Sequence, residues 1–460
     1  MAEQGSSTLI ADEQGRILDR LAGLEKTVSS DIIREVLEVT GKKNGRRCIL
    51  SHEVMLWVVL AMGVLTDLPI RQVFRCCRRR RTDEVAPCRS ALCAARQRLG
   101  VEPVRELYAR IAKPLATRET PGAFYRGFRL VGIDGTVLNV PDTEANAVFG
   151  RSTGSRGEAA FPQVRKVSLV EVGTHVEIGM AIGGWHDSEQ SLVPQLWDQI
   201  PEDALLLEDR GFFSYEAWER LHERCKLLVR VKSNMVFQPI RRLADGSYWA
   251  KIYRNPDDRK HDRRGILVRV IEYTLDDPQR TGHGEVHRLL TNLLDETAYP
   301  ALELIGLYHE RWEQELVNDE QKTHQDPPRA EKPTNLRSET PDGVRQEMYA
   351  VSLAHYVVRA MMYDAASQAK MDVDRLSFTG CFHILQCRLP ECVAHRPCSL
   401  DEWYQALLSE MRQETNPPRR NRINPRVIKR KMSKWNKKQP HHRKPEPLRK
   451  SFLDTVVMKT

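Results

Sequence analysis

Three short runs of apolar residues stand out in the middle of the chain, and each is closed by a polar residue. They are FRLVGID (residues 128–134), ALLLED (204–209) and KLLVRVK (226–232). Runs of this length, rich in Leu, Ile and Val, predict strands that are buried on both faces of a sheet. The first two end in Asp134 and Asp209, which precede Gly-Thr and Arg-Gly. We therefore expect a carboxylate at the carboxyl-terminal tip of both strands, where ligand-binding groups collect in open α/β sheets.

The segments between these runs change periodicity. Residues 164–173 and 175–185 alternate apolar and polar positions on either side of a Gly-Thr turn, which predicts an antiparallel hairpin. Residues 188–200 and 214–225 have helical spacing, and each begins with a serine, a good N-cap residue. The predicted order is strand, strand, strand, helix, strand, helix, strand. This is the order of a mixed, ribonuclease-H-like sheet in an α/β protein.

Outside this core the pattern changes again. Residues 54–65 form an unbroken run of twelve apolar residues, too short to cross a bilayer, and predict a buried core helix. Residues 236–243 are read as a strand, and an Asp-Gly turn after them is a hairpin signal. The expected divisions are a flexible N-terminus (1–19), a helical N-terminal domain (20–118), the first half of the core (119–232), a β-rich insertion (233–300), the second half of the core (301–398), and a helical segment with a basic C-terminal tail (399–460).

One predicted helix, YHERWEQELVNDEQK (308–322), carries a mixed polar stripe. At about 100° per residue, Tyr308, Arg311, Glu315 and Lys322 fall within about 60° of arc. A core helix would place apolar residues there, and a surface helix with ion pairs is the competing interpretation. An aromatic hydroxyl, a carboxylate and two cations on one face suit a site that holds phosphate and a metal ion.

Asp134, Asp209 and Glu315 together predict a metal site. Three carboxylates that converge raise one another's pKa values unless a cation neutralises them. Mg²⁺ or Mn²⁺ accepts such oxygen ligands and keeps water molecules for a substrate. Two ions about 3.5–4 Å apart would activate the attacking oxygen and stabilise the leaving oxygen of an in-line phosphoryl transfer. We therefore expect these acids to be metal ligands, with no covalent nucleophile from the protein.

Four segments carry a family resemblance: VGIDGT (131–136), LEDRGF (207–212), YHERWEQELVNDEQK (308–322) and LRSETPDGVRQEMYA (336–350). With them the chain resembles the DDE transposases of bacterial insertion sequences, in the family of the insertion-sequence-four type that is marked by a YREK signature. The resemblance extends over most of the chain. It matches Asp134 and Asp209 to the first two catalytic carboxylates and Glu315 to the signature glutamate.

The resemblance implies a cut-and-paste transposase. Such an enzyme cleaves DNA at terminal inverted repeats through a DNA hairpin, and it joins the 3′-hydroxyl ends to target DNA in a synaptic complex that is at least a homodimer. It also implies that Tyr308, Arg311 and Lys322 hold the phosphates and sugar of the transposon end, a task that suits both cations. Arg210 either joins them or forms a salt bridge at the strand end. Trp249, in the β-rich insertion, either stacks on a displaced base or packs across strands.

Charge is concentrated near the C-terminus. The chain has 460 residues and a net charge of +9, but residues 419–450 hold 14 Lys and Arg against one Glu, a local +13 that leaves −4 for the rest. A segment this basic, with four prolines, does not bury a core, although Trp435 within it could stack on a base or pack on the body. Phosphate contacts from such a tail give affinity without sequence information. Double-stranded DNA is the predicted partner, and a merely solubilising tail is the alternative.

Two further features have two interpretations each. Arg75 with residues 78–81 forms a basic edge in the helical domain, which fits either a helix-turn-helix reader of DNA ends or a plain helical bundle. Four cysteines and two histidines near the end of the core invite a zinc interpretation, against which core thiols are favoured because no C-x2-C pair is present. They are Cys381, His383, Cys387, Cys392, His395 and Cys398.

The ten cysteines are scattered through a chain without a signal peptide, which predicts a reducing compartment. We expect a bacterial cytoplasmic protein associated with the nucleoid, with no membrane partner. Two functions compete with a transposase that cleaves and joins DNA. One is a ribonuclease-H-like nuclease that cuts without joining, and the other is an inactive, DNA-binding relic of a transposase.

Overall fold

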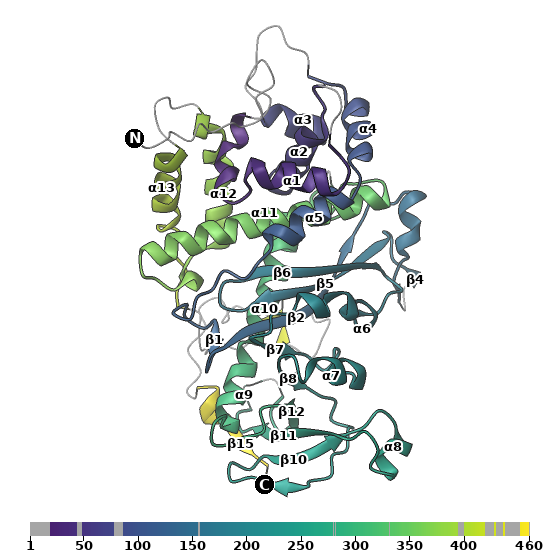
Figure 1. Ribbon diagram of the computed structural model, residues 1–460, viewed down its shortest axis with the longest axis vertical. Coiled ribbons are helices and arrows are strands. Elements are labelled where there is room, and N and C mark those ends of the chain that lie inside the picture. Colours follow the sequence, from purple (N-terminus) through teal and green to yellow (C-terminus); the bar gives the residue numbers. More distant parts are fainter. Residues whose placement is uncertain are drawn as a thin grey trace.

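The computed structural model describes residues 19–43, 48–77, 86–154, 157–278, 280, 282–330, 332–393, 400–418, 427–428, 436–437 and 451–459. A group of helices, a large sheet and a β-rich end follow one another along the long axis of the molecule (Figure 1). The long helix α11 (Pro341–Gln368) lies between the helices and the sheet. Several predicted features lie outside the described residues: nearly all of the flexible N-terminus and of the basic tail with Trp435, the arginines at 78–81, His395 and Cys398.

A single mixed sheet of eleven strands lies below the helices in Figure 1. Its main path runs β6-β5-β2-β7-β8-β12-β11-β10-β9, and β1 and β15 pair at its side. β2, β7 and β8 are parallel, and the other pairs are antiparallel. The order β6-β5-β2-β7-β8 confirms the predicted ribonuclease-H-like plan. The strands are β1 (Phe124–Tyr125), β2 (Phe128–Asn139), β5 (Gln163–Glu171), β6 (Val176–Gly184), β7 (Ala204–Glu208), β8 (Lys226–Arg230), β9 (Arg241–Arg242), β10 (Tyr248–Ile252), β11 (Ile266–Leu275), β12 (His287–Thr291) and β15 (Val456–Met458).

Strand β2 is longer than the sequence predicts. The strand does not end at Asp134, as the run of residues 128–134 predicts, but continues to Asn139. The reason is its two unequal neighbours: β7 pairs with β2 only as far as Ile133, whereas β5 pairs with it to the end. Asp134 therefore does not lie at the tip of its own strand, as expected. It lies where the parallel neighbour of that strand ends.

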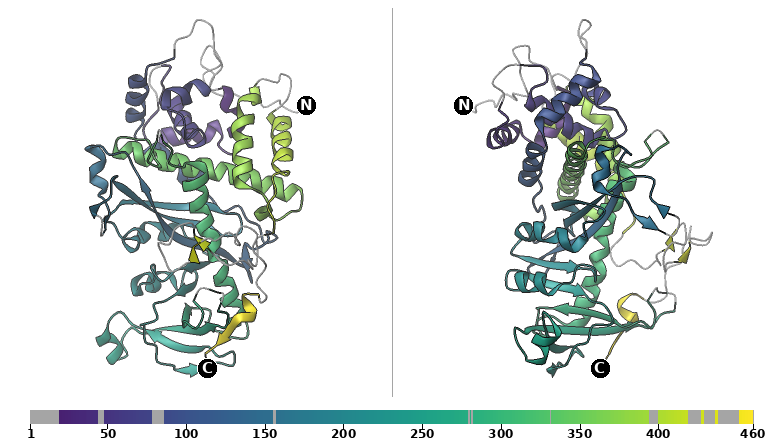
Figure 2. Two further views of the ribbon diagram at one scale, coloured as in Figure 1. Left: turned by 180° about the vertical axis from the view of Figure 1, so that it is seen from behind. Right: turned by 90° about the vertical axis from the view of Figure 1, so that its right-hand side faces the viewer.

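Helices cover both faces of the sheet. α6 (Glu189–Leu192), the 3₁₀-helix η3 (Val193–Gln199) and α7 (Tyr215–Leu221) lie in front in Figure 1. The view from behind (Figure 2, left) shows the column of α9 and α10 across the opposite face. That column consists of α9 (Ala301–His309), the 3₁₀-turn η4 (Glu310–Trp312), α10 (Glu313–Asp319) and the π-helix η5 (Glu320–Gln325). Because strand residues alternate between faces, odd and even positions of β2 and β7 meet different helices.

The helical domain packs on α11 through a helix that is buried along almost its whole length. α2 (His52–Val64) is buried from Val54 onward, as its apolar run predicts. A Cβ atom at Gly63 would lie 2.5 Å from the carbonyl carbon of Ala350, so only glycine allows α2 to approach α11 this closely. No helix within the described ranges is long and apolar enough to span a membrane. The other helices here are η1 (Asp19–Lys26), α1 (Ser30–Val39), α3 (Ile70–Cys76), α4 (Arg89–Leu99), α5 (Glu102–Ile111), α12 (Phe378–Arg388) and α13 (Leu400–Met411).

The β-rich end extends the same sheet. The strand expected at 236–243 is wrong for most of its length, since only β9 forms, and Pro239 before it has no backbone N–H to donate to a ladder. The chain end returns to this region, where β15 pairs with β11 through Tyr273 and Met458. Short elements complete the description: η2 (Ala145–Phe149), β3 (Thr153–Gly154), β4 (Gly157–Glu158), α8 (Pro256–Lys260), η6 (Val373–Arg375), η7 (Leu389–Val393), β13 (Val427–Ile428), β14 (Asn436–Lys437) and η9 (Leu453–Thr455).

Candidate active site at the end of strand β7

Asp134 and Asp209 lie side by side on neighbouring parallel strands. The register pairs Ile133 with Glu208, so the aspartates that follow are level with each other. Neighbouring strands are about 4.8 Å apart, and paired residues of parallel strands project to the same face. Ile133 and Glu208 are buried. The two aspartates therefore share the other face, which α10 covers.

Helix α10 approaches this part of β2 very closely. A Cβ atom at Gly132 would lie 3.1 Å from Cδ of Gln314 and closer still to its amide oxygen. Gln314 is fully buried, and its Nε2 donates to Ser168 O (3.1 Å). One turn later, Asn318 Nδ2 donates to Oδ2 of Asp134 (3.0 Å). Sequence analysis missed Asn318 and Gln314. Gly132, the first glycine of VGIDGT, was the available sign that a side chain packs closely on the β2 backbone.

Arg311 interacts electrostatically with all three acids. Its guanidinium is buried and pairs with Glu315, with 3.3 Å between Nη2 and Oε1. Burial alone would lower the pKa of Arg311, but Tyr308 and the negative charges of Asp209, Glu315 and Asp134 raise it above its usual value. One guanidinium thus interacts with both aspartates and with the helix glutamate. The structure brings these residues together, although Arg311 and Glu315 follow the two aspartates by more than a hundred positions in the sequence.

The other two residues of the stripe have different surroundings. Tyr308 is buried, and its hydroxyl donates to the carbonyl of Glu208 (3.2 Å), which fixes α9 to the end of β7. Burial raises the pKa of this hydroxyl far above its usual range. Lys322 is exposed and donates from Nζ to Val137 O (2.8 Å). It thus lies three residues along β2 from Asp134, about 10 Å at the rise of a strand.

The helix that carries the stripe is not uniform. It passes from α9 through a 3₁₀-turn into α10, and from Glu320 onward it is a π-helix. A π-helix is rare and often marks a functional site. It also rotates the later residues relative to the ideal 100° spacing, so that Glu320 and Gln321 are both buried while Lys322 is exposed.

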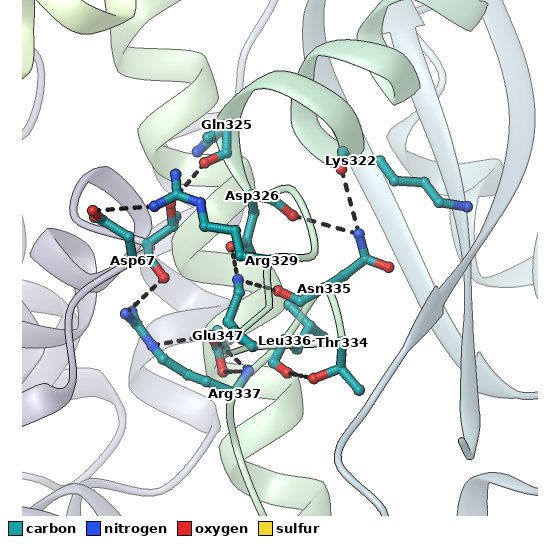
Figure 3. A network of polar contacts seen from close by, with 12 residues as sticks. Asp67, Lys322, Gln325, Asp326, Arg329, Thr334, Asn335, Leu336, Arg337 and Glu347 are labelled. Atoms are coloured by element: carbon teal, nitrogen blue, oxygen red, sulfur yellow. Dashed lines mark hydrogen bonds and ion pairs between the residues drawn. The ribbon is translucent and has the colours of Figure 1, made fainter. Parts of the chain in front are cut away.

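A polar network holds the end of this π-helix (Figure 3). Asn335 donates to the backbone carbonyl of Lys322 (3.3 Å). The Lys322 side chain points away from the network toward the sheet (Figure 3). The Arg337 guanidinium donates to the carbonyls of Met62 (2.7 Å), Leu65 (3.0 Å), Thr66 (3.0 Å) and Leu68 at the end of α2, and it pairs with Glu347 (3.1 Å). The network therefore ties the π-helix to the helical domain.

The two remaining candidates are not part of this cluster. Arg210 is exposed beside Asp209, whose Oδ1 accepts its backbone N–H (2.7 Å), and its guanidinium forms no ion pair within the described structure. Trp249 lies on β10, four strands from β7, or about 19 Å at the usual strand spacing. Its indole N–H donates to Leu294 O (3.0 Å), and the Arg241 guanidinium lies 5.1 Å from its ring centroid.

A second group of possible metal ligands lies apart from the aspartates. Nε2 of His175 is 3.3 Å from Glu313 Oε2 and 3.4 Å from Asp374 Oδ1, and all three side chains are buried. Nδ1 of His175 accepts from Arg359 (2.9 Å), whereas a histidine that binds a metal usually donates from its second nitrogen. This group therefore fits a buried polar contact behind α10 better than a metal site, and DNA cannot reach it.

A ribonuclease-H-like sheet with acids gathered where its central parallel strands meet a helix defines the class of metal-dependent polynucleotidyl transferases. Known proteins place the chain within that class. Residues 126–357 match the family model of the transposase DDE domain, and residues 18–109 match that of the insertion element 4 transposase N-terminal domain. The chain is 30% identical over 427 residues to the transposase InsG for insertion sequence element IS4 of Escherichia coli K12, covering 90% of this chain and 93% of that protein.

The chain therefore belongs to the insertion element 4 family of DDE transposases. It is also 26% identical over 194 residues to the putative transposase InsZ of Escherichia coli K12, covering 42% of this chain and 64% of that protein. Among solved structures it is similar to the piggyBac transposase in a synaptic complex with hairpin DNA, with a TM-score of 0.42 and 13% identity over 86% of this chain and 82% of that one. The predicted family, fold class and transposase function are confirmed, and with them DNA binding and the use of divalent metal ions.

Proposed function

We propose that Asp134, Asp209 and Glu315 are the catalytic carboxylates of this transposase and hold its metal ions. The observation that carries the proposal is the shared interaction of all three acids with the buried guanidinium of Arg311. A structural ion pair needs one acid for one cation. Three acids around one cation suit a site that is completed by further positive charge.

The donor set fits Mg²⁺ or Mn²⁺, and we propose two ions. The acids offer only oxygen atoms, as these cations prefer. Hydrogen bonds to the aspartates come from neutral amides, the Asn318 side chain and the Arg210 backbone. Burial, together with the charge of Glu315, raises the pKa of Asp134 to about 6, so a cation would relieve a real electrostatic cost. Bound ions would activate the attacking oxygen and stabilise the leaving oxygen of phosphoryl transfer.

The cations and the tyrosine divide into two roles. Arg311 positions Glu315 through their ion pair, and Tyr308 anchors α9 on the end of β7, so both support the acids from within the protein. Lys322 and Arg210 are exposed on either side of the aspartates and contact the phosphates of the transposon end. Stacking of Trp249 on a displaced base stays a prediction, and in this structure the Arg241 guanidinium lies over the Trp249 ring.

The proposed reaction is cleavage at the terminal inverted repeats, through a DNA hairpin, and transfer of the 3′-hydroxyl ends to target DNA. Two transposon ends must be processed together, so we propose a homodimer in the synaptic complex. The basic residues 419–450 add phosphate contacts that do not depend on sequence. The site of action is the bacterial nucleoid in the cytoplasm.

The test compares wild type with Glu315→Gln in Mg²⁺ on a labelled duplex that carries the terminal repeats of the source element. We expect hairpin and joined products from wild type. Glu315→Gln should lose about 10³-fold or more in rate, because a metal ligand supports several kcal/mol of transition-state stabilisation. Glu216→Gln is the matched control, since Glu216 is an exposed glutamate on α7.

Each alternative function gives a different result. A substrate with an already cleaved 3′-hydroxyl end tests joining alone, and cleavage without joining would indicate a nuclease. Binding without cleavage in either Mg²⁺ or Mn²⁺ would indicate an inactive relic. Cleavage that persists in Glu315→Gln would show that Glu315 is not one of the catalytic acids.

A further inference from the structure

A further acid, Glu189, lies beside the two aspartates, although no sequence motif includes it. It is the first residue of α6, whose N-cap Ser188 accepts a hydrogen bond from Ser191 N (3.0 Å). α6 lies on the face of the sheet opposite α10 (Figures 1 and 2). A side chain from that face can approach the aspartates only beyond the end of β7, and β7 ends at Glu208.

Two glycines make room for the Glu189 carboxylate. A Cβ atom at Gly135 would lie 2.6 Å from Cδ of Glu189, so any other residue there would displace it. A Cβ atom at Gly211 would lie 3.8 Å from Oε2 of Glu189, at van der Waals distance. Gly135 directly follows Asp134, and Gly211 is two residues after Asp209. The carboxylate thus lies against the backbone next to both aspartates.

Arg165 holds Glu189 at this position. Its Nη1 donates to Oε1 of Glu189 (3.3 Å) from β5, where Arg165 is paired with Val137 of β2. The guanidinium also lies 5.3 Å from the ring centroid of Trp185 and donates to the carbonyl of that residue (3.5 Å). The Arg165 guanidinium therefore has contacts with Trp185 in addition to its ion pair with Glu189.

The charge of Glu189 acts on the same site as the other acids. The pKa of Asp134 is raised first by burial and then by the negative charges of Glu315 and Glu189. Asp134 accepts a hydrogen bond from the neutral side-chain amide of Asn318, and Asp209 accepts one from the backbone N–H of Arg210. A cation bound next to Gly135 would therefore interact favourably with Glu189 and both aspartates.

We propose that Glu189 is a fourth metal-binding carboxylate of the transposase site, which binds the divalent ion held by Asp134 and Asp209. The proposal rests on the assignment of those aspartates as metal ligands under the proposed function. Without metal, Glu189 is held by Arg165. When the ion binds, the carboxylate exchanges this partner for the metal, as an all-oxygen ligand set for Mg²⁺ or Mn²⁺ allows. Acids then reach the ion from both faces of the sheet.

The test measures binding of Mn²⁺ to the full chain without DNA, through the electron paramagnetic resonance signal of the free ion. Glu189→Gln should weaken Mn²⁺ binding about tenfold or more, the size of effect known even for groups that only support a metal ligand. The matched control Glu216→Gln should bind as wild type does. Wild-type affinity in Glu189→Gln would overturn the proposal.

Arg165→Gln provides a second measurement with the opposite expected sign. Loss of the competing partner should tighten Mn²⁺ binding when Glu189 is present, and this gain should disappear in the double variant with Glu189→Gln. An equal gain in both backgrounds would reflect a general charge effect and would contradict the role of Glu189.

Asp134→Asn separates this inference from the proposed function. If Asp134→Asn weakens Mn²⁺ binding and Glu189→Gln does not, the inference alone fails. If neither variant changes the affinity, the carboxylate triad fails as well. Thermal unfolding without metal checks that each variant is folded. Should Glu189→Gln not fold, Glu189→Asp keeps the charge but withdraws the carboxylate by one methylene, and wild-type affinity in that variant overturns the proposal equally.

Discussion

Glu320, at the end of α10, and the two aspartates at the end of β7 have opposite kinds of hydrogen-bond partner. Glu320 is buried, and its Oε2 accepts hydrogen bonds from His355 (2.9 Å) and from Arg359 (3.1 Å). The Arg359 guanidinium also pairs with the other carboxylate oxygen of Glu320. Asp134 and Asp209, by contrast, accept hydrogen bonds from neutral amides. The acid that follows α10 is therefore paired with a cation, whereas the two aspartates that α10 covers have neutral hydrogen-bond donors.

The difference is visible in the protonation equilibria. Burial alone would raise the pKa of Glu320, but Arg359 and His355 hold it well below its usual range. The pKa of Asp134 moves the other way, to about 6, because burial and like charges prevail there. Glu320 thus has a guanidinium and an imidazole to itself, whereas Asp134, Asp209 and Glu315 share the one guanidinium of Arg311 and keep an excess of negative charge that favours a further cation. Local pairing therefore distinguishes structural from functional carboxylates better than burial does.

The largest expected effect comes from breaking the paired acid. Glu320→Gln leaves the buried Arg359 guanidinium without its counter-charge, and we expect a loss of about 3–5 kcal/mol in the free energy of unfolding. Urea unfolding of the metal-free chain measures it. Asp319→Asn is the control, because that neighbouring acid is largely exposed and should change stability by less than about 0.5 kcal/mol.

Glu315→Gln completes the comparison in the same assay. It should destabilise the metal-free chain less than Glu320→Gln does, because Asp134 and Asp209 still interact with the Arg311 guanidinium, while it abolishes cleavage. Equal destabilisation by Glu315→Gln and Glu320→Gln would mean that the two groups of acids do not differ as their contacts indicate.

A smaller loss is expected at the junction with the helical domain. Arg337→Lys retains the positive charge beside Glu347. A lysine ammonium, however, cannot donate to all of the carbonyls at the end of α2 that the planar guanidinium binds. We expect a destabilisation of about 2–3 kcal/mol from the lost hydrogen bonds. Urea unfolding followed by fluorescence measures it, and Arg345→Lys, a variant of a half-buried arginine on α11, is the control. An unchanged urea midpoint in Arg337→Lys would show that the Arg337 contacts in the network of Figure 3 contribute little to stability.

Much of this comparison could be predicted from local sequence. Short apolar runs predict β2, β7 and β8, and the mixed stripe of residues 308–322 predicts a functional helix, because both signals depend on periodicity alone. The pairing of Glu320 could not be predicted, since its partner Arg359 is 39 residues away on another helix. The π-helix that turns Glu320 inward also has no signature in an ideal 100° pattern.

The same limit applies at the candidate site itself. Glu189 and Asn318 join it through contacts with residues that are distant in the sequence, and a sequence shows them merely as one acid and one amide among many. The glycines at 132 and 135 were the available local sign, because each marks a point where a side chain packs directly on the β2 backbone. Their partners became known only with the fold.

The smallest expected effect is the pH dependence of metal binding. Asp134 must lose its proton to bind a cation, and its pKa in the metal-free chain is raised to about 6. Mn²⁺ affinity should therefore rise up to about tenfold per pH unit as pH approaches 6 and become nearly constant above it. The stability that protonated Asp134 gives the metal-free chain has the opposite dependence: it is complete below the unfolded pKa near 3.8 and is lost as pH rises through 6.

Electron paramagnetic resonance titrations at pH 5, 6, 7 and 8 measure this profile, with Glu216→Gln as the control that should reproduce it. A rise that continues to pH 8 would point to another titrating group. Glu208 is the candidate, because burial raises its pKa to about 8 and it directly precedes Asp209. Glu208→Gln then decides between Asp134 alone and Asp134 with Glu208. If Mn²⁺ affinity levels off near pH 6 in this variant but not in wild type, the rise above pH 6 belongs to Glu208. An unchanged rise to pH 8 in Glu208→Gln would contradict the predicted control of metal binding by Asp134.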